Sequence, residues 1–166
     1  ANTTGTNNTA VGMTAGDAIT TGDFNVFVGK DAGTATTTAD SNVSVGESSF
    51  LVNTTGAGNT ALGANSLGSN TTAANNTAVG KSALYANTTG ANNIGIGRDA
   101  GINVVTGGDN VFIGAFSGDN TTGSQNVLIG SSTSTSSAGG GNQIAIGQNV
   151  TGSGNGNFTF GDGTTD

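Results

Sequence analysis

The sequence predicts an all-β fold: a parallel β-solenoid, or β-roll, of about ten coils of 17 residues each. The first observation is a pattern, Asn-x-x-aliphatic-Gly, whose glycine recurs every 17 residues over its first seven copies. The second is a short period-2 alternation inside each copy, which is typical of a strand with one face inward. A unit this small cannot bury its own apolar face, but identical units stacked on one another can.

The residue before each recurrent glycine is apolar in every copy, and the residue two positions earlier is a good strand former. We therefore expect the residues before the glycines to form the core. They are Val11, Val28, Val45, Leu62, Val79, Ile96, Ile113, Ile129 and Ile146. A second short strand is expected after each glycine, as in residues 47–52 and 82–86, followed by a turn such as Asn53–Gly56. Gly and β-branched residues recur throughout, so helix should be nearly absent.

An amide side chain opens every copy of the pattern, and stacking would place these side chains in one column. Amides can form a ladder in which each side chain donates to the next along the rod. We expect this column to be structural and not a binding stripe. It comprises Asn8, Asn25, Asn42, Asn59, Asn76, Asn93, Asn110 and Asn126, continued by Gln143 and Asn157.

The composition excludes most enzyme classes. Gly, Asn and Thr fill 81 of the 166 positions, and His, Cys, Pro and Trp do not occur. No thiolate nucleophile, Ser-His dyad or ordinary zinc site can form without His and Cys. We expect no enzymatic activity and no cofactor. Nucleic-acid binding is excluded because the net charge is −7 with only three cations, and no apolar stretch is long enough for membrane insertion.

Acidic residues supply one weak metal candidate. Asp23 and Asp40 fall in the same column one coil apart, so their carboxylates could share a cation. Solvated loop carboxylates are the favoured interpretation, because the column continues with alanines. Lys30 and Glu47 also share a column in adjacent coils and are predicted to form an exposed ion pair.

The residue between the two aliphatic positions of each strand should point away from the core, yet it carries no charge. Such a column suits close approach of another chain, so we expect it to contact other copies. Its members are Ala10, Phe27, Ser44, Ala61, Ala78, Gly95, Phe112, Leu128, Ala145 and Thr159.

Residues 76–90 resemble repeats of bacteriophage tail fibres that carry an endosialidase-type chaperone. Residues 126–130 and 143–147 resemble the head repeats of YadA-like trimeric adhesins. The resemblance covers all ten copies. It implies a parallel β-roll, three chains wound side by side into a fibre, and display outside a cell or on a virion.

The sequence as a whole favours a non-enzymatic fibre element of an extracellular appendage that supports attachment. We expect one domain over residues 1–166, regular over 5–130 and less regular over 131–166. The chain starts in mid-repeat, which suggests a portion of a longer fibre protein or subunits stacked end to end. Its partners would be further copies of itself and a cell-surface receptor or glycan.

Two alternatives remain open: a self-assembling extracellular filament subunit and an ice-binding solenoid. Ice binding is suggested by paired threonines such as Thr71 and Thr72, which recur in most coils. Neighbours on an extended segment point to opposite faces, so these pairs should not form the two parallel columns of a flat ice-matching surface.

Overall fold

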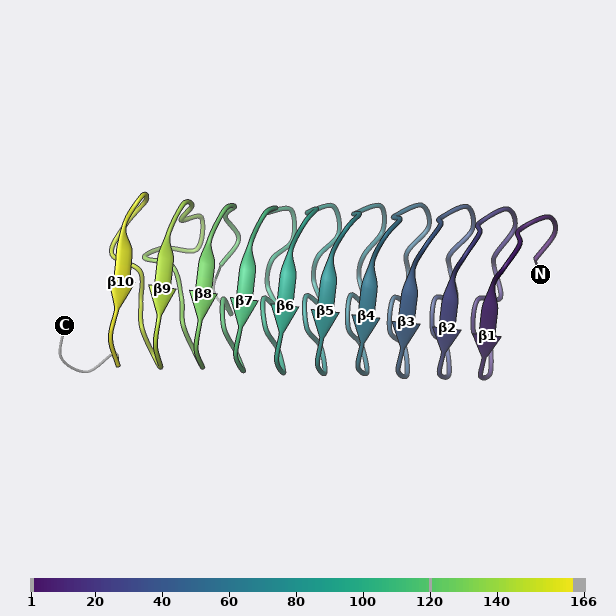
Figure 1. The fold of residues 1–166 in the computed structure, drawn as a ribbon, viewed down its shortest axis with the longest axis horizontal. Helices are drawn as coiled ribbons and strands as arrows, with labels where there is room; N and C mark the ends of the chain where they lie inside the picture. Colours follow the sequence, from purple (N-terminus) through teal and green to yellow (C-terminus); the bar gives the residue numbers. More distant parts are fainter. Residues whose placement is uncertain (1, 120, 163–166) are drawn as a thin grey trace.

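The computed structural model describes residues 2–119 and 121–162. It contains ten strands of three residues each, one for each copy of the repeat (Figure 1). The strands are β1 (Thr9–Val11), β2 (Val26–Val28), β3 (Val43–Val45), β4 (Thr60–Leu62), β5 (Thr77–Val79), β6 (Ile94–Ile96), β7 (Val111–Ile113), β8 (Val127–Ile129), β9 (Ile144–Ile146) and β10 (Phe158–Phe160).

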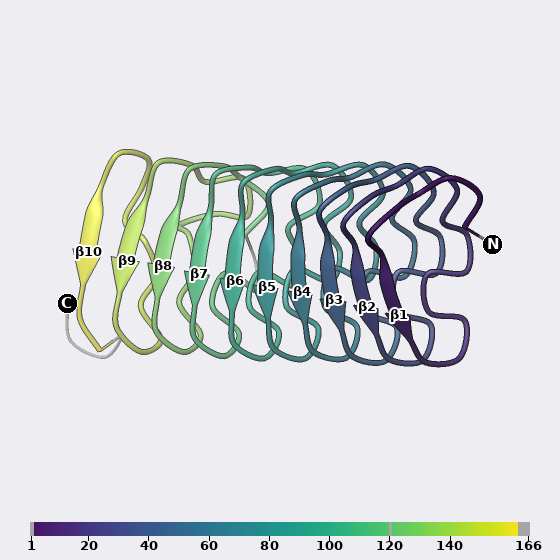
Figure 2. The same cartoon turned by 45° about the vertical axis from the view of Figure 1, so that its right-hand side comes forward.

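The strands form one parallel sheet in the order β1 to β10, so each strand pairs with the strands before and after it in the chain. Pairing places equivalent residues of successive repeats side by side, as in Thr77 with Ile94 and Val79 with Ile96. The result is an extended rod with one strand per coil (Figures 1 and 2). The predicted parallel β-solenoid is confirmed, and the described residues contain no helix.

The second strand expected in each coil is wrong. Residues 81–86 form consecutive turns, and within them Ser82 and Leu84 have φ angles of 56° and 51°. Left-handed residues at every second position curl the chain and prevent an extended strand. The return path of these coils is therefore a turn that carries side chains inward, and outside the sheet the described residues pair as strands only at the isolated bridge between Ser134 and Thr151.

The predicted core is also wrong, because the two faces of each strand are reversed. Val11, Val45, Leu62, Ile96 and Ile113 are exposed, with 37–58% of their surface accessible. The other predicted core residues, Val28, Val79, Ile129 and Ile146, are only partly buried. From β2 to β9 the central residues expected to contact other copies point into the coil instead, whereas Ala10 in β1 is exposed and Thr159 in β10 is partly exposed. Phe27, Ser44, Ala61, Ala78, Phe112, Leu128 and Ala145 are completely buried.

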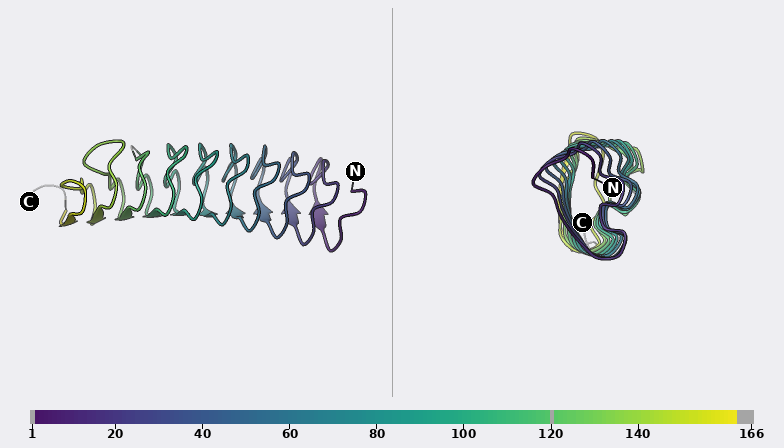
Figure 3. Two further views of the ribbon diagram at one scale, coloured as in Figure 1. Left: turned by 90° about the horizontal axis from the view of Figure 1, so that it is seen from above. Right: turned by 90° about the vertical axis from the view of Figure 1, so that its right-hand side faces the viewer.

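The interior explains this reversal, because each layer of the narrow coil holds about one large side chain. In some coils the strand centre supplies it, as Phe27 and Phe112 do, and in others the turn supplies it, as Leu67 and Leu84 do. Where Phe27 fills the layer, the turn carries Gly33, and a Cβ added there would lie 2.7 Å from the ring. A strand that turned two β-branched side chains inward would overfill this space. Seen along the rod, successive coils repeat the same closed outline (Figure 3, right).

The glycine that ends each strand is required by the stacking itself. Gly80 has a φ of 130°, and an added Cβ would lie 2.6 Å from the carbonyl oxygen of Gly97 in the next coil. A side chain would therefore push adjacent coils apart. The recurrent glycine therefore serves the close approach of adjacent coils.

Exchanging sizes within one layer should test the packing rule. Phe27→Ala alone should lower the free energy of unfolding by about 3–5 kcal/mol, because it leaves a cavity. Adding Gly33→Leu should recover part of that loss, because it recreates the arrangement of Ala61 and Leu67, where leucine is accommodated at a φ of 49°. Urea denaturation followed by circular dichroism measures both. A double variant less stable than Phe27→Ala would contradict the one-large-residue rule.

Candidate functional site

The predicted amide column is present as a buried ladder that joins the coils. The Oδ1 atom of Asn59 accepts the backbone N–H of Asn76 at 2.9 Å and its Nδ2 at 3.2 Å. Asn76 in turn accepts the backbone N–H of Asn93 at 2.8 Å. The same backbone bond joins every pair of adjacent coils from Asn8 to Gln143. Both amide and backbone donors are satisfied inside the rod, so this column cannot serve as an exposed binding stripe.

A second amide ladder was missed by the sequence analysis, which identified Asn53 only as part of a turn. The Nδ2 atom of Asn70 donates to Oδ1 of Asn53 at 2.8 Å, and Asn87 continues the column. All three side chains are completely buried. Each also holds its own turn closed, as Asn87 does by bonding both the N–H and the carbonyl of Gly90. The Asn-Thr-Thr sequence that begins at residues 53, 70 and 87, at a spacing of 17, was the available signal.

Thr36 occupies the same column one coil before Asn53. Its hydroxyl is the one buried side-chain polar atom without a hydrogen-bond partner among the described residues. Thr121, further along this column, instead shares a bond of 3.1 Å with the hydroxyl of Thr135. The column therefore contains one matched and one unmatched hydroxyl in equivalent positions.

The paired threonines lie in a bend and not on the extended segment that the sequence analysis assumed. Thr71 and Thr72 both reach the surface, and their N–H groups both point to the carbonyl of Thr88. The hydroxyl of Thr71 donates to that carbonyl at 3.1 Å. From Thr20 to Thr88 the first threonine of each pair donates in this way and forms a third lengthwise ladder, while the second is exposed.

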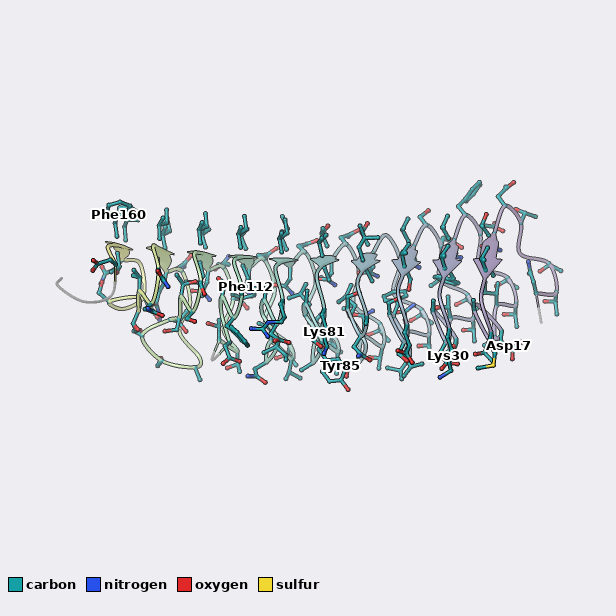
Figure 4. All side chains as sticks on the ribbon, turned by 90° about the horizontal axis from the view of Figure 1, so that it is seen from below. Asp17, Lys30, Lys81, Tyr85, Phe112 and Phe160 are labelled. Carbon is teal, nitrogen blue, oxygen red and sulfur yellow. The ribbon has the colours of Figure 1, made fainter. Side chains whose placement is uncertain are left out.

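The outward face of the sheet is an apolar surface that runs along the rod. It consists of the first and third residues of every strand, which form two columns that we call the outer columns. None of their side chains is charged; three are threonines (Thr9, Thr60 and Thr77) and the rest are Val, Leu, Ile or Phe. Their exposure is greatest at β10, where Phe158 and Phe160 are 62% and 69% exposed. Charged side chains such as Lys30 and Lys81 lie on the opposite side of the rod (Figure 4).

The charged side carries small ion pairs. The ammonium of Lys30 lies 3.1 Å from Asp31 and 3.8 Å from Glu47, so the predicted cross-coil pair is confirmed. Hydrogen bonds from the Thr14 hydroxyl and from Lys30 lower the pKa of the Asp31 carboxyl. The bond to Asp31 correspondingly raises the pKa of Lys30. These groups are exposed, so they contribute little to stability.

The two carboxylates of the weak metal candidate bond to backbone groups of adjacent coils. Oδ1 of Asp23 accepts the backbone N–H of Thr6, and Oδ1 of Asp40 accepts the backbone N–H of Asp23 at 2.7 Å. The carboxylates thus tie adjacent coils together. Residues 2–119 and 121–162 hold no group of three or more acidic, His or Cys side chains that could bind a metal. They also contain no helix long and apolar enough to cross a membrane.

The amide ladder changes at Gln143, in the segment that was expected to be less regular. Its backbone N–H still bonds to Asn126. Its longer side chain turns to the loop after β8, where it accepts the N–H of Ser136 and donates to the hydroxyl of that residue. The side-chain ladder therefore stops one coil before β10, while the backbone pairing continues.

Comparisons with protein-family models, with curated proteins and with solved structures find no significant match to this chain. The geometry that bears on function is a rod with two buried amide ladders, a threonine ladder at its surface, one apolar side and one charged side.

Replacing Asn76 by Ala should lower the free energy of unfolding by roughly 1–3 kcal/mol, because the buried N–H of Asn93 loses its acceptor. Thermal melting followed by circular dichroism measures the change. The control is Thr72→Ala, at an exposed position outside the amide ladder. This variant should have the same melting temperature as the parent. An unchanged melting temperature for Asn76→Ala would contradict a structural ladder.

Thr36→Val should leave the stability unchanged or raise it by about 1 kcal/mol, because it replaces an unpaired buried hydroxyl with a methyl group. Thr121→Val, in the same column, removes a hydroxyl that has a partner and should lower the stability. Urea denaturation of the two variants and the parent measures both changes in the free energy of unfolding. Equal losses in both would show that the Thr36 hydroxyl is satisfied in solution.

Proposed function

We propose that this chain is a non-enzymatic structural element of an extracellular fibre, of the type found in phage tail fibres and trimeric adhesins, and that it supports attachment. The observation that carries the proposal is the continuity of bonding along the rod. Ten strands pair in one unbroken parallel sheet, and the Asn and Thr ladders add side-chain bonds in the same direction. A load along the axis is therefore shared by several parallel rows of hydrogen bonds.

The chemistry of the surface supports the same function. The carboxylates engage backbone groups or cations of this chain, as Asp40 and Asp31 do. Neither amide ladder offers free groups to a ligand, since both are buried. The coils differ from one another in their turn residues, and Tyr85 and the cation-π pair of Arg98 and Phe116 reach the surface there. A cell-surface receptor or glycan would be recognised there.

Electron microscopy of the purified protein tests the fibre proposal. We expect straight particles of uniform width, at least as long as ten stacked strands, or about 45 Å. Limited proteolysis should leave the stacked coils intact, because their backbone is held on both sides by neighbouring coils. Collapsed or flexible particles that are cleaved throughout residues 5–130 would contradict the proposal.

The same preparation separates the fibre from its alternatives. Long filaments would favour the self-assembling subunit, and discrete rods of several chains would favour a shaft. A stable single rod would favour ice binding, because the threonines of both columns reach the surface in the coils from Thr20 to Thr89. Sedimentation at several concentrations distinguishes the three outcomes by mass.

A further inference from the structure

The paired threonines form a surface whose regularity the packing of the rod does not explain. We infer that this surface binds ice, and that its ligand is the water lattice of the crystal. The inference goes beyond the proposed fibre function, to which the second threonine of each pair contributes nothing, and it makes ice binding an activity of the fibre and not an alternative to it. We call the two columns together the threonine face. Its first column contains Thr3, Thr20, Thr37, Thr54, Thr71 and Thr88, and its second contains Thr4, Thr21, Thr38, Thr55, Thr72, Thr89 and Thr106.

The first column of the threonine face is held in place by the rod. The hydroxyl of Thr54 donates to the carbonyl of Thr71 at 3.1 Å, and the hydroxyl of Thr71 donates to the carbonyl of Thr88 at 3.1 Å. A threonine bonded in this way has a fixed side-chain torsion, so its methyl group also has a fixed position. The side chains of this column therefore repeat at the spacing of paired strands, about 4.8 Å.

The second column is exposed and makes no side-chain bond within the rod. Every member from Thr4 to Thr106 is exposed, and none of their hydroxyls bonds to another group of residues 2–119 and 121–162. In the same coils, the surface position after the recurrent glycine is occupied by Met, Lys, Glu, Ala or Arg. A surface position of the coil is thus not restricted to one residue type. A ligand that repeats with the coils explains why threonine recurs in the second column.

The bend between the coils brings both columns to one surface. The N–H groups of Thr71 and Thr72 point to the same carbonyl, so these residues do not alternate as they would in a strand, and both reach solvent. The surrounding residues are small and uncharged in the middle of the rod. Residues 52–58, 69–75 and 86–92, which contain three of the pairs, include no charged side chain. The middle of the threonine face is therefore a neutral array with two side chains in each coil.

The chemistry of this array fits ice. Ice is a neutral lattice of hydrogen-bond donors and acceptors, and each hydroxyl offers one donor and two acceptor lone pairs. Water beside the methyl groups is restricted in its orientations, which favours a lattice over the liquid. The spacing of the coils is close to the shortest repeat of hexagonal ice, so successive threonines meet equivalent water positions. An ionic mineral would instead require carboxylate ligands, and those of Asp23 and Asp40 are bonded to backbone N–H groups.

Freezing assays on the full chain test the threonine face. The parent should be taken up into growing ice and should lower the freezing temperature below the melting temperature. The double variant Thr55→Lys with Thr72→Lys should lose both effects, because the lysine side chains keep the lattice away from the face. Circular dichroism should show the β signal of the parent, since neither threonine hydroxyl bonds within the rod.

Glu47→Lys is the matched control. It lies in the same coil as Thr55 but outside the threonine face. Its one Glu-to-Lys exchange adds as much positive charge as the two Thr-to-Lys exchanges of the double variant. The control should be taken up into ice like the parent, so a loss confined to the double variant reflects the position of the lysines and not the net charge.

The other outcomes overturn the inference without touching the fibre proposal. A parent that is excluded from ice and leaves the freezing temperature unchanged overturns ice binding, and binding of that protein to microcrystalline cellulose would assign the face to a different neutral lattice. Ice activity that survives in the double lysine variant overturns the threonine face as the site. The fibre proposal fails only if electron microscopy and proteolysis show collapsed or cleaved particles.

Discussion

The constraint on which this structure depends is the narrow width of the coil interior. Each layer has room for about one large side chain, supplied by the strand at Phe27 and by the turn at Leu67. Small residues or glycine must then stand opposite, as Gly33 does beneath the Phe27 ring. The aliphatic residues at the first and third positions of the strands, which favour extended structure, consequently lie on the outside. The core therefore contains few large apolar side chains, and the outward face of the sheet is apolar.

Hydrogen bonds between buried side chains compensate for the small number of large apolar side chains in the core. In an ordinary domain the interior is filled mainly by apolar side chains, whereas here Asn42, Asn59 and Asn76 lie fully inside and satisfy each other and the backbone. Burying an amide is costly unless its donors and acceptors are matched. Repetition provides the match, because each Asn finds an identical Asn in the adjacent coil. Each coil is therefore stabilised mainly by its bonds to the coils on either side of it.

Repetition also explains which features could be predicted. Spacing of 17 residues, parallel pairing and the Asn ladder all follow from the requirement that equivalent residues stack. The alternation at Val43, Ser44 and Val45 shows that the two valines share a face, but period 2 does not say which face is inward. That choice depends on the interior width, which is set by the turn. The path of the turn depends on left-handed φ angles at Ser82 and Leu84. Neither serine nor leucine predicts such an angle from its residue type.

The uniform length of the coils has a consequence for how such a chain can change over generations. Between Gly12 and Gly114 the repeats have equal length, so recombination between misaligned repeats of the gene would remove or add whole coils. The ladders would rejoin, since every coil presents the same Asn and Gly to its neighbour. An insertion of a single residue in a strand would instead turn its side chains over and break the stack. Rod length can therefore drift in steps of one coil while cross-section stays under strict selection.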